Sequence, residues 1–182
     1  MNPGSTYLLE TLKSFKGMKS NTEKALAQLS DAQLHYAPNQ ESNSAVILMQ
    51  HLAGNMLSRF TDFLTTDGEK PNRNRDAEFI DHFTNREALF NYWEKGWSCL
   101  ISVIESLQEE VLLKTVFIRN EPHSVLRALN RQLIHYAYHC GQIVYVCKLV
   151  KGIEFENLSI PRGKSGDVLS VPPGESSPTS NR

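Results

Sequence analysis

The sequence predicts an all-α protein, a four-helix bundle with long crossover connections. Apolar residues recur with the helical period in four long segments, and no comparable segment alternates at period two. The connections between these segments are too long for tight turns, so the chain must cross over between some neighbouring helices. A chain of 182 residues needs no disulfide or structural metal to bury its core. We expect one helical domain over residues 1–165 and a disordered tail, rich in Ser, Pro and Gly, over residues 166–182.

The first two helices are predicted from apolar stripes and from signals at their ends. The first helix is expected from about Thr6 to Leu29. A turn-rich connection follows, and Ser30 and Gln33 at its start are spaced as a capping box. The second helix is expected to follow Ser44, its N-cap, and to reach about Thr65 before the Asp67-Gly68 pair ends it.

The third and fourth helices also have start and stop signals. Thr84 and Glu87 have capping-box spacing, which predicts that the third helix begins there. The fourth helix is expected from about Ser124 to Lys151, where Gly152 supplies a C-terminal stop. The predicted core stripe of the third helix consists of Leu89, Trp93, Trp97, Leu100, Ile104 and Leu107.

Composition excludes several classes of protein. A net charge of -1, from 19 basic and 20 acidic residues, argues against a general nucleic-acid binder. No apolar stretch approaches the roughly 20 residues of a membrane helix, and the first residues lack the apolar core of a signal peptide. The three cysteines contain no CxxC pair. The sequence therefore predicts a cytoplasmic protein with no membrane or nucleic-acid partner.

Three histidines form a candidate metal site. His135 and His139 are four residues apart in the fourth helix, which places both rings on one face, about one turn apart. His51 lies in the second helix on a mixed polar and apolar face. If these faces meet, three imidazoles converge and leave one position open, the ligand pattern of a catalytic zinc site. The alternative is a chance His pair that is solvated or hydrogen-bonded. The other histidines, His35, His82 and His123, are expected at the surface.

Polar residues near this site are candidates for orienting the ligands or the substrate. Asn55 lies one turn from His51, and Gln142 lies close to one turn beyond His139. Arg73 and Arg75, in the charged crossover between the second and third helices, are candidates for binding an anionic substrate because guanidinium suits carboxylate and phosphate. Arg162 and Lys164 are weighed in the same role. The alternative for all six is ordinary solvated surface.

A resemblance to a known family extends over most of the chain. It is carried by the strings QHLAGNMLSRF, DFLTTDGEKPNRNRDAEF, HYAYHCGQIVY and LSIPRGKS. They resemble an uncharacterised, bacillus-type branch of the DinB/YfiT-like superfamily of four-helix-bundle metalloproteins. The resemblance implies one divalent metal ion held by His51, His135 and His139. Characterised members of that superfamily include bacillithiol S-transferases and a mycothiol-dependent isomerase.

This resemblance leads to three functional hypotheses. The first is a metal-dependent transferase that uses a low-molecular-weight thiol, similar to the bacillithiol S-transferases, and a small-molecule substrate. The second is a metal-dependent hydrolase with hydroxide in place of thiolate. The third is a non-catalytic, stress-associated metal-binding protein. Zinc is the expected ion, with nickel, iron or manganese as alternatives, since imidazole ligands alone do not select one metal. A homodimer is also expected from the resemblance.

Overall fold

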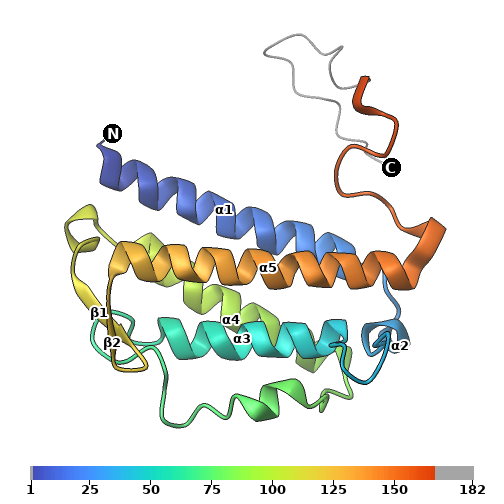
Figure 1. Cartoon of the computed structure of the whole chain (residues 1–182), viewed down its shortest axis with the longest axis horizontal. Coiled ribbons are helices and arrows are strands. Elements are labelled where there is room, and N and C mark those ends of the chain that lie inside the picture. Colours follow the sequence, from blue (N-terminus) through green and yellow to red (C-terminus); the bar gives the residue numbers. More distant parts are fainter. Residues whose placement is uncertain (1, 167–182) are drawn as a thin grey trace.

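The computed structural model describes residues 2–166 and is mostly helical, which confirms the predicted helical class (Figure 1). Within that range one two-stranded antiparallel sheet accompanies the helices. The predicted disorder of the tail concerns residues 167–182, which lie outside the described part. The elements in chain order are α1 (Pro3–Leu26), α2 (Asp31–Leu34), α3 (Ala45–Phe60), η1 (Asp76–Phe79), α4 (Arg86–Ser106), η2 (Glu109–Val111), β1 (Thr115–Ile118), β2 (Glu121–Ser124), α5 (Val125–Lys151) and η3 (Gly152–Glu154).

The four long helices enclose a common core. Helix α5 packs on α1 and α3, and α4 packs on α3 and α1 behind it (Figure 1). The residues that meet between them have lost nearly all contact with solvent, as the hydrophobic effect requires of a large apolar face. The predicted burial of the two tryptophans of α4 is confirmed. The largest fully buried side chains come from all four long helices and include Phe15, Met56, Trp93, Trp97 and Tyr136.

Several of the predicted helix ends are confirmed by hydrogen bonds. The Ser30 hydroxyl accepts from the Gln33 amide, while the Gln33 side chain accepts from the Ser30 amide, which is the predicted capping box. Ser44 caps α3, and Ser124 caps α5. Gly152 follows α5 with φ of 61°, a conformation that glycine adopts without the steric cost of a Cβ. These local signals position the start of both helices that carry the histidines.

Two predicted helix starts are wrong. Helix α4 is capped by Asn85, which accepts from the Ala88 amide, so Thr84 and Glu87 do not form the predicted capping box. Asn is as good an N-cap as Thr, and the choice between adjacent candidates depends on how the connection enters the helix. Helix α1 begins earlier than predicted, at Pro3, with Asn2 as its N-cap.

Helix α3 ends at Phe60, before the predicted end near Thr65. Thr61 is extended, and Asp62 adopts a φ of 49°, which takes the chain out of the helix. Asp tolerates this left-handed region better than most residues. The five residues after α3 thus form turns, and they carry the chain toward the hairpin.

The β1–β2 hairpin was not predicted; the sequence analysis treated it as part of a connection. Arg119 and Asn120 occupy its two-residue turn with φ of 56° and 62°, the pair of positive values that a type I′ hairpin turn requires. The Asp67 carboxylate accepts from both of their backbone amides, at 2.9 and 2.7 Å. The Gly68 amide donates to the Phe117 carbonyl at 2.8 Å. The loop after α3 therefore holds the hairpin turn in place.

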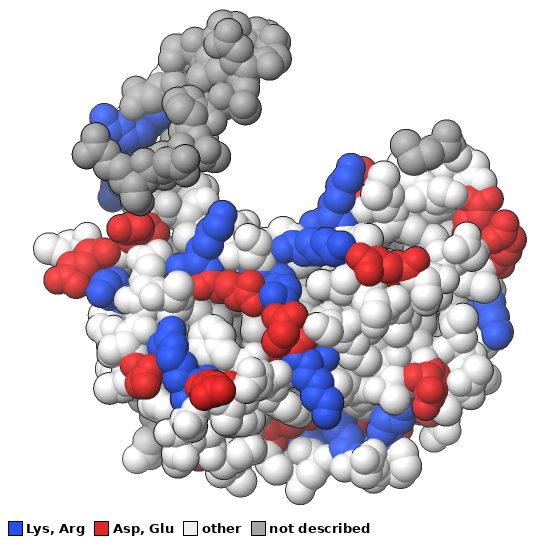
Figure 2. Space-filling view, turned by 180° about the vertical axis from the view of Figure 1, so that it is seen from behind, with Lys and Arg blue, Asp and Glu red and all other residues white. Residues whose placement is uncertain are grey.

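The face of the molecule behind α5 carries mixed charge. Acidic and basic side chains lie interspersed across it (Figure 2). Ion pairs between α1 and α4 include Lys16 with Glu105 and Lys19 with Glu94. Exposed pairs of this kind contribute little to stability. Over the described residues, no helix combines the length and the apolar character that crossing a membrane demands.

Candidate metal centre

Three imidazole rings converge between α3 and α5. His51 is 3% exposed on α3, and its Nε2 lies 3.4 Å from Nε2 of His135 on α5. The His139 ring centroid lies 5.0 Å from that of His51 and 4.7 Å from that of His135. One potential ligand atom from each of the three lies within 4.8 Å of the other two. Two nitrogens bound to one tetrahedral ion at about 2.05 Å lie about 3.3 Å apart, close to the 3.4 Å between His51 and His135, so the three rings could hold a metal ion if rotation brings the His139 nitrogen to the same distance.

A carboxylate that the sequence analysis did not single out orients His51. The Nδ1 of His51 lies 2.9 Å from Oε2 of Glu78, which belongs to η1 in the crossover between α3 and α4. Burial raises the pKa of the Glu78 carboxyl, but hydrogen bonds from His51 and Arg73 outweigh it and hold the pKa below its ordinary value. The carboxylate is therefore ionised at neutral pH and accepts the Nδ1 hydrogen of His51. This leaves the Nε2 lone pair of His51 free to face the other two rings, the arrangement common at metal-ligating histidines.

Arg73 fixes Glu78 in turn. Its Nε and Nη2 donate to Oε1 and Oε2 of Glu78, each at 2.7 Å, in the two-point geometry that suits guanidinium and carboxylate. The side chains of Arg73 and Glu78 are only 5% and 9% exposed. Burial lowers the pKa of Arg73, but its bonds to Glu78 and Glu69 outweigh this and raise it. The pair is thus charged, buried and geometrically defined.

Gly54, one turn after His51, creates the space for this carboxylate. A Cβ at residue 54 would lie 2.5 Å from Oε1 of Glu78 and 3.2 Å from the hydroxyl of Tyr92. A glycine inside a helix costs about 1 kcal/mol relative to alanine. The glycine allows Glu78 to approach the α3 backbone closely enough to reach His51.

The two amides predicted near the site have separate contacts. Gln142 Oε1 lies 2.7 Å from Nδ1 of His139, so this amide holds the His139 ring with Nε2 on the opposite side. Asn55 accepts a 3.0 Å hydrogen bond from the Tyr136 hydroxyl and also lines the cavity over the histidines. Asn55 therefore joins α3 to α5 directly beside the site.

The histidines on α5 are neutral at physiological pH. Burial and the neighbouring His139 and His51 rings lower the pKa of His135 to about 3. Burial also lowers the pKa of His139, although its contact with Gln142 opposes the change. A neutral imidazole has the free lone pair that a metal needs. Within residues 2–166, no carboxylate or thiol completes the group as a fourth ligand.

The histidines open into a cavity of about 330 Å³ with an arginine-rich lining. Both Arg73 and Arg75 line it, as do three arginines that the sequence analysis did not single out; Arg162 and Lys164 do not. The arginines of the lining are Arg59, Arg73, Arg75, Arg119 and Arg131.

One carboxylate joins three of these arginines. Glu69 accepts from Arg59 at 3.0 Å, from Arg73 at 3.2 Å and from Arg119 at 2.9 Å. Burial raises the pKa of Glu69, but the bonds from Arg59 and Arg119 outweigh it, and its pKa falls to about 2. Glu69 therefore links the end of α3, the crossover and the hairpin turn at one edge of the cavity.

The other three histidines and the two buried cysteines lie outside the cavity lining. His35 and His82 are exposed as predicted, but the prediction for His123 is wrong: it is 6% exposed in β2, and it does not line the cavity. Burial raises the pKa of Cys140 to about 11 and that of Cys147 to about 12. Both thiols are therefore protonated and unreactive at neutral pH.

Residues 2–164 match the model of a family described as "Protein of unknown function (DUF1572)". The chain belongs to this family. No functionally curated protein matches it. A crystal structure of a conserved protein from Enterococcus faecalis is similar, with a TM-score of 0.61 and 18% identity, over 84% of this chain and 99% of that one. At this identity the likeness shows a shared fold and carries no reaction with it.

Proposed function

We propose that this family member is a metal-dependent transferase that uses a low-molecular-weight thiol, and that its helices form a four-helix bundle of the DinB/YfiT-like type. The observation that carries the proposal is the convergence of three imidazoles next to an open cavity, with no fourth histidine, carboxylate or thiol in the group among residues 2–166. A closed, four-ligand site would instead favour a structural metal. The carboxylate behind His51 and the amide behind His139 support the same proposal, because they orient two of the rings.

The reaction we propose is nucleophilic displacement by sulfur. A bound divalent ion would act as a Lewis acid and lower the pKa of a thiol at the open position. The thiol proton goes to solvent, the sulfur forms a bond to an electrophilic carbon of the second substrate, and the leaving group departs with its bonding electrons. Zinc is the ion we favour for three imidazoles; nickel, iron and manganese are outcomes for metal analysis.

Cobalt substitution tests this proposal. Thiolate coordination to Co²⁺ adds an intense near-ultraviolet absorption band, so titration of 2-mercaptoethanol into the cobalt-loaded protein should produce that band with a saturating dependence. His51→Ala should abolish or distort it, because the ring that Glu78 orients would be gone. The matched control is His35→Ala, which removes an exposed imidazole outside the cluster.

A cobalt spectrum that no thiol perturbs at millimolar concentration would contradict the transferase proposal. The hydrolase hypothesis would then be tested with ester and amide substrates. The non-catalytic hypothesis would be supported by a metal-edge absorption spectrum that shows a fourth protein ligand.

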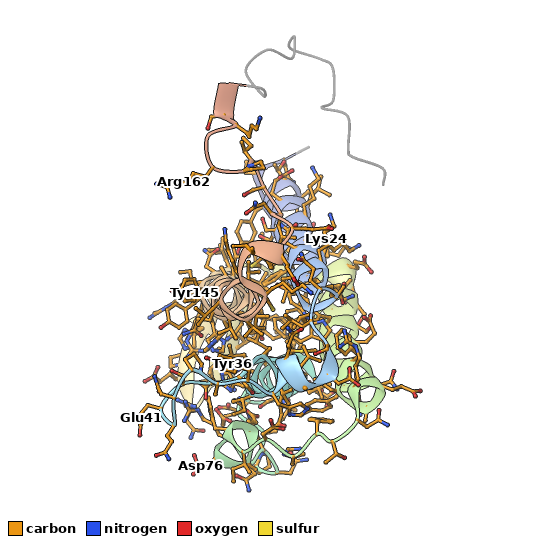
Figure 3. All side chains as sticks on the ribbon, turned by 90° about the vertical axis from the view of Figure 1, so that its right-hand side faces the viewer. Lys24, Tyr36, Glu41, Asp76, Tyr145 and Arg162 are labelled. Atoms are coloured by element: carbon orange, nitrogen blue, oxygen red, sulfur yellow. The ribbon has the colours of Figure 1, made fainter. Side chains whose placement is uncertain are left out.

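We also propose that the protein forms a homodimer, as the resemblance implies. Exposed apolar side chains follow one side of α5, and Tyr145 lies on the outer face of this helix (Figure 3). Such a stripe supports a cytosolic homodimer that buries α5 against its symmetry mate. The exposed apolar residues on this side are Ile134, Tyr138, Tyr145 and Leu149.

A further inference from the structure

Two arginines of the cavity have no carboxylate partner within residues 2–166. Arg131, on α5 one turn before His135, makes no ion pair or side-chain hydrogen bond there. Arg75 places its guanidinium 5.2 Å from the centre of the Phe79 ring and makes no ion pair or side-chain hydrogen bond in that range. Their donors are therefore available to a molecule in the cavity.

A third arginine carries an unused donor in a buried position. Arg59 is 3% exposed and lines the same cavity. Its terminal nitrogens bond the Gly68 carbonyl and Glu69, whereas its Nε has no partner. A buried N–H without an acceptor destabilises the protein, and a ligand oxygen that reached it would remove that cost.

The charge of the lining is strongly unbalanced. Its five arginines face two paired carboxylates, Glu69 and Glu78, which leaves an excess of three positive charges beside the histidines. Arg59, Arg73 and Arg119 are bound by these two carboxylates, whereas Arg75 and Arg131 have no carboxylate partner among residues 2–166. A cleft with one sign of charge and low-dielectric walls attracts small ions of the opposite sign.

We propose that the cavity binds a substrate carrying a carboxylate or phosphate, held by Arg131 and Arg75 while its reacting group lies at the three histidines. The guanidinium fork matches both of these anions. A volume of about 330 Å³ lies at the small end of ligand pockets and suits a small molecule. This inference rests on the proposed function and adds to it the substrate class. In this proposal Arg73 holds Glu78, and Arg131 joins Arg75 as a receptor for the anion.

Matched thiols test the inference on the cobalt-loaded protein. The probes are 2-mercaptoethanol, 3-mercaptopropionate and 2-mercaptoethyl phosphate, titrated at one pH with each constant corrected for the thiol's own pKa. At least one anionic thiol should bind about tenfold more tightly than the neutral one, the difference expected from one charge-assisted contact. The anionic thiol with the larger gain in affinity over 2-mercaptoethanol identifies which group the site prefers, carboxylate or phosphate.

Arginine variants locate the effect. Arg131→Gln and Arg75→Gln should each remove most of that advantage, and the loss of affinity should be clearly larger for the anionic thiol than for 2-mercaptoethanol. Arg127→Gln is the matched control, because this exposed arginine lies one turn from Arg131 on α5 but outside the cavity lining. Equal losses in the control and in Arg131→Gln would show a long-range charge effect and overturn the assignment.

The two proposals fail in different ways. Equal affinity for neutral and anionic thiols would overturn the anion site and leave the thiol transferase standing. If no thiol perturbs the cobalt spectrum, the transferase fails, and calorimetry with inorganic phosphate and with propionate then decides the anion site. Binding that Arg131→Gln abolishes would support the site, and absence of binding would overturn it.

Discussion

Replacing His135 or His139 with alanine is expected to weaken metal binding by more than a hundredfold while the protein stays folded. Structural zinc sites contribute roughly 10–16 kcal/mol in apparent binding energy, or about 3 kcal/mol for each of four ligands. That share corresponds to more than a hundredfold in the dissociation constant. Both side chains are only partly buried, and the core does not rest on them. The measurement is a chelator competition for zinc, together with circular dichroism.

His82→Ala is the control for this experiment, because His82 is an exposed imidazole outside the cluster. It should retain full affinity. If His135→Ala and His139→Ala also kept full affinity, the metal would bind elsewhere and the convergence of the three rings would have another cause.

Replacing Glu78 with glutamine is expected to weaken both metal binding and the fold. Loss of the charge behind His51 should reduce metal affinity by about 10- to 100-fold, as is common when the partner of a ligating histidine is removed. The same change leaves the buried guanidinium of Arg73 with Glu69 as its one carboxylate partner. Breaking a buried ion pair costs about 3–5 kcal/mol. Because Arg73 keeps its contact with Glu69, we expect the free energy of unfolding to fall by about 3 kcal/mol. Denaturant unfolding and chelator competition measure the two losses.

Asp76→Asn provides the matched control. Asp76 is an exposed carboxylate at the start of the same η1 turn and lies on its outer side (Figure 3). Its replacement should change neither quantity measurably. A Glu78→Gln protein with wild-type affinity would show that the carboxylate does not orient His51, whatever its effect on stability.

The long helices could be predicted from the sequence because their signals are local. The 3.6-residue apolar period and the caps at Ser44 and Ser124 depend on neighbours along the chain. The hairpin was missed for the opposite reason. Its strands are four residues each, and its turn is held by Asp67, about 50 residues earlier in the chain. Short strands of this kind carry too little periodicity to be distinguished from a loop.

The residues of the candidate site also differ in whether the sequence could reveal them. The spacing of His135 and His139 is a local pattern, and the position of His51 on a mixed helix face could be read from the sequence. Glu78 could not be found from a fixed spacing along the sequence. It lies 27 residues from His51, in a crossover whose path depends on the tertiary fold. One signal was available: Gly54, a glycine inside a helix one turn from His51, indicates a close approach by another group.

The most direct test of the metal centre is a crystal structure of the zinc-loaded protein, with diffraction data on both sides of the zinc absorption edge. We predict one anomalous peak between α3 and α5, about 2.0–2.1 Å from one nitrogen each of His51, His135 and His139. The fourth position should hold a solvent molecule or an added thiol. A peak away from these three residues, or a carboxylate or cysteine of the chain in the fourth position, would contradict an open three-histidine site.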